Sequence, residues 1–305
     1  MTIRALGPAA GWSWLAKAIN LGRGNPKAVI GAIALLAVIA LVPSFLQVLL
    51  QQLLPVETVM VMAGVMTLAM IVVYPLLIGG VLRVIHAVER GVPTRAGAVF
   101  DTFKPSEDRA RLIGFGVVMA FIYIAMFIVV VSVFGKGFMA WYMEVIQISA
   151  QFSAAGDTSK PPVYPPAPDG MGTMMALLMA FGLYFGGVYA IGFGQVALAG
   201  RSLKQALSDG FAGSLKNLLP IIVLAAISFF GMIALSFVLV LVGGILALIG
   251  GLIHPAVAVL LVMPLYLAML LVVYMVMFGV MYHLWRDIGA DPVQPPALPP
   301  NQVEL

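Results

Sequence analysis

The sequence predicts an all-α integral membrane protein with six transmembrane helices. Three observations lead to this prediction: 62% of the 305 residues are hydrophobic, only 9% are charged, and the apolar residues gather in six long runs. A soluble domain carries about 25% charged residues, and a helix needs roughly 20 apolar residues to cross the hydrocarbon core of a bilayer. A chain this apolar is therefore expected to fold in lipid.

The six predicted spans follow one another with tight or short connections, apart from one long connection after the third span. They cover residues 28–52, 58–84, 110–134, 172–198, 218–248 and 255–284. The first run exceeds the roughly 7–15 apolar residues of a signal peptide, so it is interpreted as an uncleaved span. Asn25, Thr94 and Ser106 precede helical segments and are predicted to cap them. Three spans contain a proline that is expected to kink the helix: Pro43, Pro75 and Pro264.

The long connection, 135–171, and the C-terminal segment, 290–305, have compositions of their own. Residues 137–152 are aromatic and apolar, which favours a helix in the outer interface, where Trp and Tyr are enriched. Residues 160–170 are Pro-rich and are predicted to be extended. The Pro-rich tail 290–305 is predicted to be a disordered cytoplasmic end, with docking to a partner as the alternative.

The distribution of positive charge predicts the orientation. Of the 16 Lys and Arg residues, all except Lys136 and Lys160 lie on the side that holds both chain ends and the connections after spans 2 and 4. Lys and Arg near span ends are retained on the cytoplasmic side. Both termini are therefore predicted to be cytoplasmic.

Short amphipathic segments precede spans 1, 3 and 5. Each carries one apolar stripe at helical spacing: "WLAKAINLGRGNP", "TRAGAVFDTFK" and "RSLKQALSDGFAGSLKNLLP". Such helices are expected to lie in the interface, with the apolar side toward the acyl chains.

The ends of spans 2, 4 and 6 are also alike: "GGVLRVIHAVERG", "GGVYAIGFGQVALAG" and "FGVMYHLWRDIG". Together with the amphipathic segments they predict a threefold repeat of interfacial helix plus transmembrane hairpin, at residues 8–91, 92–200 and 201–289. The alternative is that any cytoplasmic connection between spans tends to be short, basic and amphipathic.

Two of these patterns resemble known groups of proteins. The N-terminal "GWSWLAKAINLGRGNP" resembles a group of uncharacterised bacterial six-span inner-membrane proteins. More distantly, "SLKQALSDGFAGSLKNLLP" before span 5 resembles the membrane domain attached to some glycerophosphodiester phosphodiesterases. The resemblance implies the architecture and a bacterial inner-membrane location. It implies no activity, because the catalytic domain of those phosphodiesterases is absent from this sequence.

Ionisable residues gather at the predicted cytoplasmic ends of spans 2 and 6. Arg83, His86 and Arg90 lie at spacing i, i+3, i+7, and the corresponding end of span 6 carries His283, Arg286 and Asp287. Basic pockets between spans can bind anionic lipid headgroups, so these residues are a candidate headgroup site. The alternative is that their long side chains anchor the helix ends at the interface.

Span 4 carries a predicted packing surface. Small residues recur there every four positions and would let another helix, of this chain or of another copy, approach closely: Gly182, Gly186, Ala190 and Gly194. The polar residue Gln195 in the same span is interpreted as a partner for a neighbouring helix.

Several kinds of chemistry lack the residues they require. The chain has no Cys, and its three His are far apart in sequence, so no metal or cofactor is expected. Neither a nucleophile–base pair nor a phosphate-binding loop is present, and the spans lack central carboxylates that could carry protons. We therefore expect no enzyme activity. Nucleic-acid binding is not expected either, because the basic residues are spread along the span ends.

Two function classes remain. The first is a non-catalytic membrane scaffold or subunit, which would bind a membrane-protein partner or associate with itself. The second is a protein that handles lipids or transports a small solute and binds anionic headgroups at the candidate site. Membrane lipids are expected partners in both.

Overall fold

The computed structural model describes residues 3–51, 53–155 and 161–289, and within these ranges the chain is helical, with no strand. Six helices are long and apolar enough to cross a membrane, which confirms the predicted all-α membrane protein. These six are α2 (Pro26–Gln51), α3 (Val56–Glu89), α4 (Glu107–Phe134), α6 (Met171–Ala197), α8 (Leu218–Gly251) and α9 (Pro255–Gly289). The shorter elements are α1 (Ala10–Ile19), the 3₁₀ helix η1 (Ala96–Phe103), α5 (Phe138–Ala155) and α7 (Leu203–Lys216).

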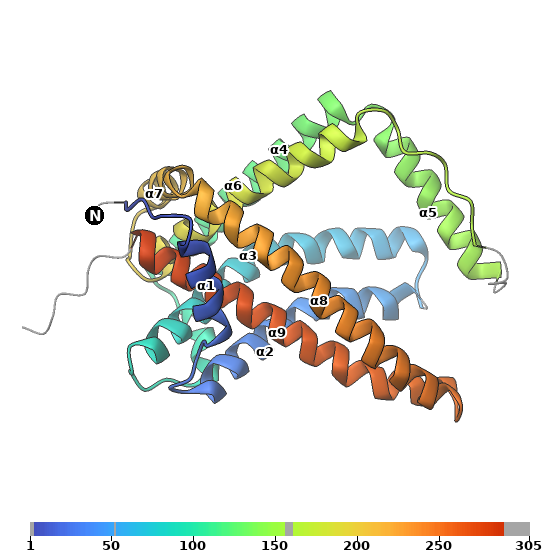
Figure 1. Ribbon diagram of the computed structural model, residues 1–305, viewed down its shortest axis with the longest axis horizontal. Helices are drawn as coiled ribbons and strands as arrows, with labels where there is room; N and C mark the ends of the chain where they lie inside the picture. The colour runs from blue at the N-terminus through green and yellow to red at the C-terminus, as the bar shows by residue number, and fades with distance from the viewer. Residues whose placement is uncertain (1–2, 52, 156–160, 290–305) are drawn as a thin grey trace, which may run out of the picture.

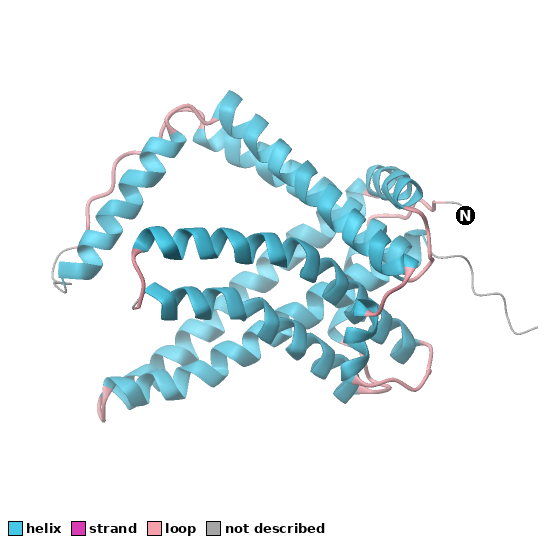
Figure 2. Ribbon diagram, turned by 180° about the vertical axis from the view of Figure 1, so that it is seen from behind, coloured by secondary structure: helices cyan, strands magenta, loops and turns pink. Residues whose placement is uncertain are grey.

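The long helices form three hairpins, α2/α3, α4/α6 and α8/α9, which converge at one end and diverge toward the other (Figure 1). The view from behind shows the same divergence (Figure 2). We call the converged end, which holds α1, η1, α7 and the C-terminal ends of α3, α6 and α9, the basal end. The two ends of the described chain meet there, where the backbone N–H of Arg4 donates to the carbonyl of Ile288 at 3.1 Å.

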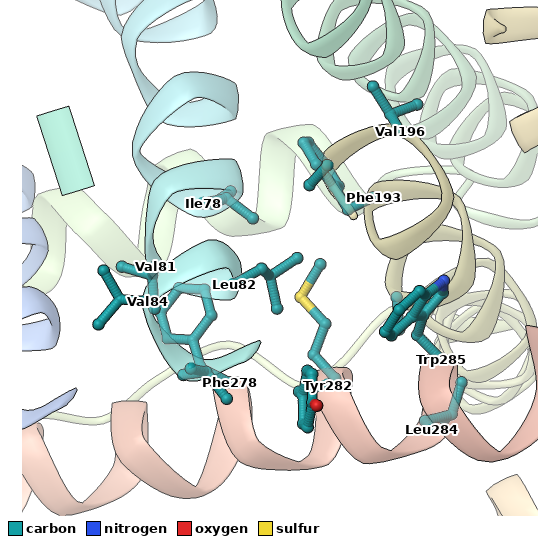
Figure 3. Packing of buried hydrophobic residues seen from close by; sticks show 14 of the residues in the cluster. Ile78, Val81, Leu82, Val84, Phe193, Val196, Phe278, Tyr282, Leu284 and Trp285 are labelled. Carbon is teal, nitrogen blue, oxygen red and sulfur yellow. The ribbon is translucent and has the colours of Figure 1, made fainter. Parts of the chain in front are cut away.

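The hydrophobic core lies near the basal end. Leu82 of α3, Phe193 of α6 and Tyr282 of α9 belong to one buried cluster, drawn in Figure 3. Farther out the hairpins bury little of their surface against one another: Phe45, Leu68 and Phe237 are each about two-thirds exposed. An apolar surface of this kind is expected to face lipid.

Local polar groups fix two of the helix starts as predicted. Asn25 Oδ1 accepts from the N–H of Ala28 at 3.1 Å at the start of α2, and Ser106 Oγ accepts from the N–H of Arg109 at 3.2 Å at the start of α4. The predicted cap at Thr94 is wrong, because η1 begins at Ala96 without a side-chain cap.

The three short basal helices pack in a cyclic order. Helix η1 packs on α2 and α3, the hairpin before it, and α7 packs on α6, again in the hairpin before it. No hairpin precedes α1 among the described residues, and α1 packs instead on α8 and α9, the third hairpin. Each short helix is therefore covered by a hairpin other than the one that directly follows it in the chain.

One glycine in each hairpin permits this close packing. Gly80, Gly187 and Gly279 are the second residues of the three similar span ends. A Cβ at these positions would collide with the Val99 backbone of η1, the Ser214 side chain of α7 and the Ala18 backbone of α1, respectively. These collisions show that the short helices lie almost in backbone contact with the hairpins.

The expectation that the short helices turn their apolar sides toward the acyl chains is wrong. Trp14 and Ala18 of α1 and Ala206 of α7 are fully buried within the protein. The physical reason is the glycine positions just described, which offer an apolar protein surface at closer range than lipid.

The segment before α4 also differs from prediction in its helix type. Three residues per turn in a 3₁₀ helix place positions i, i+3 and i+6 on one face, so Val99 and Thr102 are buried while Phe100 is 40% exposed. The Thr102 hydroxyl donates to the carbonyl of Leu76 at 2.8 Å, which holds η1 on α3.

The long connection contains the predicted helix, as α5. The segment after it runs back along α5 without regular structure (Figure 1). Trp141 Nε1 donates to the carbonyl of Pro165 at 3.1 Å and joins the two. The predicted disordered tail, 290–305, lies outside the described residues.

Candidate headgroup site at the basal end

The C-terminal ends of α3 and α9 lie side by side at the basal end. His86 Nδ1 lies 3.2 Å from the Tyr282 hydroxyl, and the Arg286 guanidinium lies over the Tyr282 ring at 5.6 Å from its centroid. Arg286 also pairs with Glu89 at 3.8 Å. The structure thus brings His86 and Arg286 together, as the headgroup hypothesis requires, but it places a carboxylate beside them.

Arg83 points to a different neighbour. Its guanidinium pairs with Asp108 of α4 at 2.9 Å, and its Nε donates to the carbonyl of Ala197, the last residue of α6, at 3.0 Å. About a third of the side chain is exposed. Arg83 therefore links the first hairpin to the second.

The remaining two predicted residues differ in accessibility. His283 is 2% exposed, and its Nδ1 has no hydrogen-bond partner among the described residues. Arg90 is exposed and contacts only His86, at 3.4 Å, among the hydrogen bonds of the described chain. Arg90 is accordingly the one of the five that a headgroup can reach most directly.

Asp287 is a residue whose role the sequence interpretation missed. Its Oδ2 accepts from Lys17 Nζ at 2.9 Å and from the indole N–H of the fully buried Trp14 at 3.2 Å, and both donors belong to α1. The sequence shows this acidic residue directly after Arg286, but the partners of its carboxylate lie about 270 positions away along the chain. The Asp287 carboxylate ties the first helix to the last.

Gln195 contacts neighbouring elements as interpreted. Its amide N–H₂ lies 3.1 Å from Asp209 of α7 and 3.3 Å from the carbonyl of Gly289 at the end of α9. Asp209 in turn pairs with Arg201 at 3.4 Å. This group joins the second hairpin to the third unit.

At the end of η1, Lys104 and Asp101 form an exposed ion pair at 2.6 Å. The ammonium group of Lys104, which donates this bond, lowers the pKa of Asp101. An exposed pair of this kind contributes little to stability.

The four small residues of span 4 do not form one continuous contact in this chain. A Cβ at Gly182 or Gly186 would meet nothing within 4 Å, whereas one at Gly194 would collide with the Trp285 ring. Ala190 is buried at 8% exposure. The basal half of the predicted surface is therefore covered by this chain, and the half at Gly182 and Gly186 is not.

A cavity of about 380 Å³ opens where α2 and α3 face α4 and α6. None of its lining residues is charged, and five carry hydroxyls: Ser44, Thr67, Tyr74, Tyr123 and Tyr189. The sequence analysis did not single out any of these five residues, because hydroxyl side chains scattered over four spans form no local pattern. No group of three or more His, Asp or Glu within the described ranges could hold a metal ion.

Comparison of the chain with protein-family models, curated proteins and solved structures gives no match.

Substitution of Arg83 distinguishes an anchoring role from a binding role. Arg83→Ala is expected to destabilise the protein by about 1–2 kcal/mol, because hydrogen bonds to charged groups contribute about 1.5–3 kcal/mol and solvent weakens this partly exposed pair. Arg90→Ala, on the same helix end, is expected to leave stability unchanged. Thermal unfolding of both variants in nanodiscs checks this, and an equal effect of the two substitutions would contradict it.

Proposed function

We propose that this chain is a non-catalytic scaffold or subunit in the inner membrane of a bacterium, with both termini in the cytoplasm. Its basal end is a rigid base, and its three hairpins extend into the membrane as surfaces for other membrane proteins. Six helices of the described chain are long and apolar enough to cross a membrane.

The observation that carries the proposal is the pairing of the basal charges with one another. Arg83 pairs with Asp108, Arg286 with Glu89, and Lys17 with Asp287. Each pair joins elements of different predicted units. Charged groups that were arranged for a ligand would face an open pocket, whereas these hold the hairpins in fixed positions.

The cyclic packing of α1, η1 and α7 supports the same proposal. It repeats one contact three times, with a glycine at the same place in each hairpin. This regularity supports the predicted threefold repeat and gives each hairpin a firm attachment. A base fixed in this way suits a protein that positions partners.

The uncovered surface of α6 offers the test. Gly186→Leu adds a side chain where a Cβ meets nothing in this chain, so the substitution is expected to be neutral or slightly stabilising. If α6 receives a partner helix there, the bulky side chain is expected to reduce co-purification of that partner, or self-association, at least tenfold. Native mass spectrometry from gently extracted membranes measures the composition of the complex.

A conservative change on an exposed face elsewhere, Val240→Leu on α8, serves as the control, since Val240 is 73% exposed. If wild type and Gly186→Leu are both found as a single copy of the chain bound only to lipid, the scaffold proposal is contradicted. The second candidate, lipid handling, is favoured by the hydroxyl-lined cavity and would then lead. In that case Arg90→Ala is the substitution that tests headgroup binding, because Arg83 has a structural role.

A further inference from the structure

We propose that the cavity between the first two hairpins binds a neutral lipid whose polar group is a hydroxyl, of the diacylglycerol class. This inference does not depend on the scaffold proposal, since it concerns a different part of the molecule.

The position of the cavity along the helices determines whether its hydroxyls are surrounded by water or by hydrocarbon. Tyr123 lies sixteen residues after the start of α4 at Glu107, and Tyr189 lies eight residues before the end of α6 at Ala197. At a rise of 1.5 Å per residue these positions are about 24 and 12 Å from the basal helix ends. The hydrocarbon core is about 30 Å thick, so both phenols lie within it.

Two of the hydroxyls have no hydrogen-bond partner within the described chain. Tyr74 donates to the carbonyl of Ala40 at 3.5 Å, and Thr67 to that of Ala63 at 2.8 Å. Tyr123 and Tyr189 lie together, with ring centroids 6.4 Å apart, and neither hydroxyl has a hydrogen-bond partner among the described residues. A polar group left unpaired in an apolar medium costs free energy. These two phenols are therefore poised to donate to an acceptor in the cavity.

A proline in the cavity wall removes one helical hydrogen bond of α3. Pro75 has no N–H, so the carbonyl of Ile71, four residues earlier in α3, receives no helical bond from it. Both residues line the cavity. A ligand that matches this site accepts a hydrogen bond from the tyrosines and donates one to a carbonyl. A hydroxyl group can do both.

The lining restricts the charge of the occupant. No lining residue is charged, and an unpaired charge in a medium of low dielectric constant is strongly disfavoured. A phosphate or ammonium headgroup is thereby excluded from the cavity. The volume of about 380 Å³ falls within the range of small-molecule sites and suits the polar end of a lipid. The acyl chains would continue along exposed apolar residues of the same helices, such as Phe45 and Leu68.

The test uses the full chain in nanodiscs to which one lipid is added at a time. Diacylglycerol and phosphatidic acid share their acyl chains and differ only in the hydroxyl or phosphate at the third carbon. Triacylglycerol carries an ester there and no hydroxyl. Native mass spectrometry is expected to retain one diacylglycerol per chain, and neither of the other two lipids.

The matched variant is Tyr123→Phe with Tyr189→Phe, which removes both hydroxyls and keeps both rings. It is expected to bind diacylglycerol about tenfold more weakly, a change of about 1.4 kcal/mol that two modest hydrogen bonds supply. Tyr266→Phe, at a half-exposed tyrosine of α9 outside the cavity, is expected to bind as wild type.

Three outcomes would overturn the inference. Equal retention of phosphatidic acid shows that charge is not excluded, and equal retention of triacylglycerol shows that the hydroxyl is not recognised. Diacylglycerol binding that is unchanged in the double variant, or absent in the wild type, would show that no such lipid binds at the tyrosines. In each case the melting temperature must show that the protein is folded. None of these results bears on the Gly186→Leu test, so the two proposals can fail separately.

Discussion

Gly80→Ala is expected to destabilise the protein by about 1–3 kcal/mol, the usual cost of inserting extra atoms into a well-packed site. The added Cβ would overlap the carbonyl oxygen and carbonyl carbon of Val99 in η1. Because the overlap is with backbone, no rotamer change relieves it, and η1 must move away from α3. The buried Thr102, whose hydroxyl bonds the carbonyl of Leu76, moves with it.

Gly64→Ala in the same helix is the control for this substitution. A Cβ at Gly64 meets nothing within 4 Å, so this change is expected to be neutral or stabilising by up to about 1 kcal/mol, since alanine is the better helix former. Thermal unfolding in nanodiscs compares the two. If Gly80→Ala melts no lower than Gly64→Ala, the tight packing of η1 on α3 is refuted.

Trp14→Ala is expected to have the largest effect, a loss of about 3–5 kcal/mol. Trp14 is fully buried between α1 and α9, and its indole N–H donates to Asp287. The substitution removes this bond and leaves a cavity at the position where the first helix meets the last. Trp14→Phe, which keeps most of the apolar volume, is expected to cost less than half as much.

Trp12 provides a matched comparison two residues away. It is 59% exposed, and Trp12→Ala is expected to change the unfolding free energy by no more than about 0.5 kcal/mol. Unfolding followed by far-UV circular dichroism measures each variant without relying on tryptophan fluorescence. Similar losses for the two tryptophans would show that α1 lies on the membrane surface rather than on α9.

The spans were predictable because their hydropathy is a local property. Each predicted range agrees with the observed helix to within a few residues, from α2 to α9. The same holds for α5, whose aromatic and apolar residues favour a helix on their own. Membrane helices satisfy their backbone hydrogen bonds within the segment, so no knowledge of neighbours is required to find them.

The partners of the polar residues were not predictable from local patterns. The Arg83–Asp108 pair and the Trp14–Asp287 bond depend on which hairpins lie side by side, as does the meeting of Tyr123 and Tyr189. Of the apolar stripe predicted for α1, Trp14 and Ala18 are buried but Ile19 is 57% exposed. A stripe alone does not distinguish lipid from protein as its apolar neighbour. The glycines at the hairpin ends let the short helices pack closely on the protein. This close packing depends on the three-dimensional arrangement of the hairpins, which the local sequence does not reveal.

The cyclic packing of the basal helices has a consequence for biosynthesis. The ribosome delivers α1 before α8 and α9, the two helices on which α1 packs. Until α8 and α9 have been made, α1 lacks the helices on which it packs in the finished protein. Helix α1 can dock on the third hairpin only after that hairpin has been inserted.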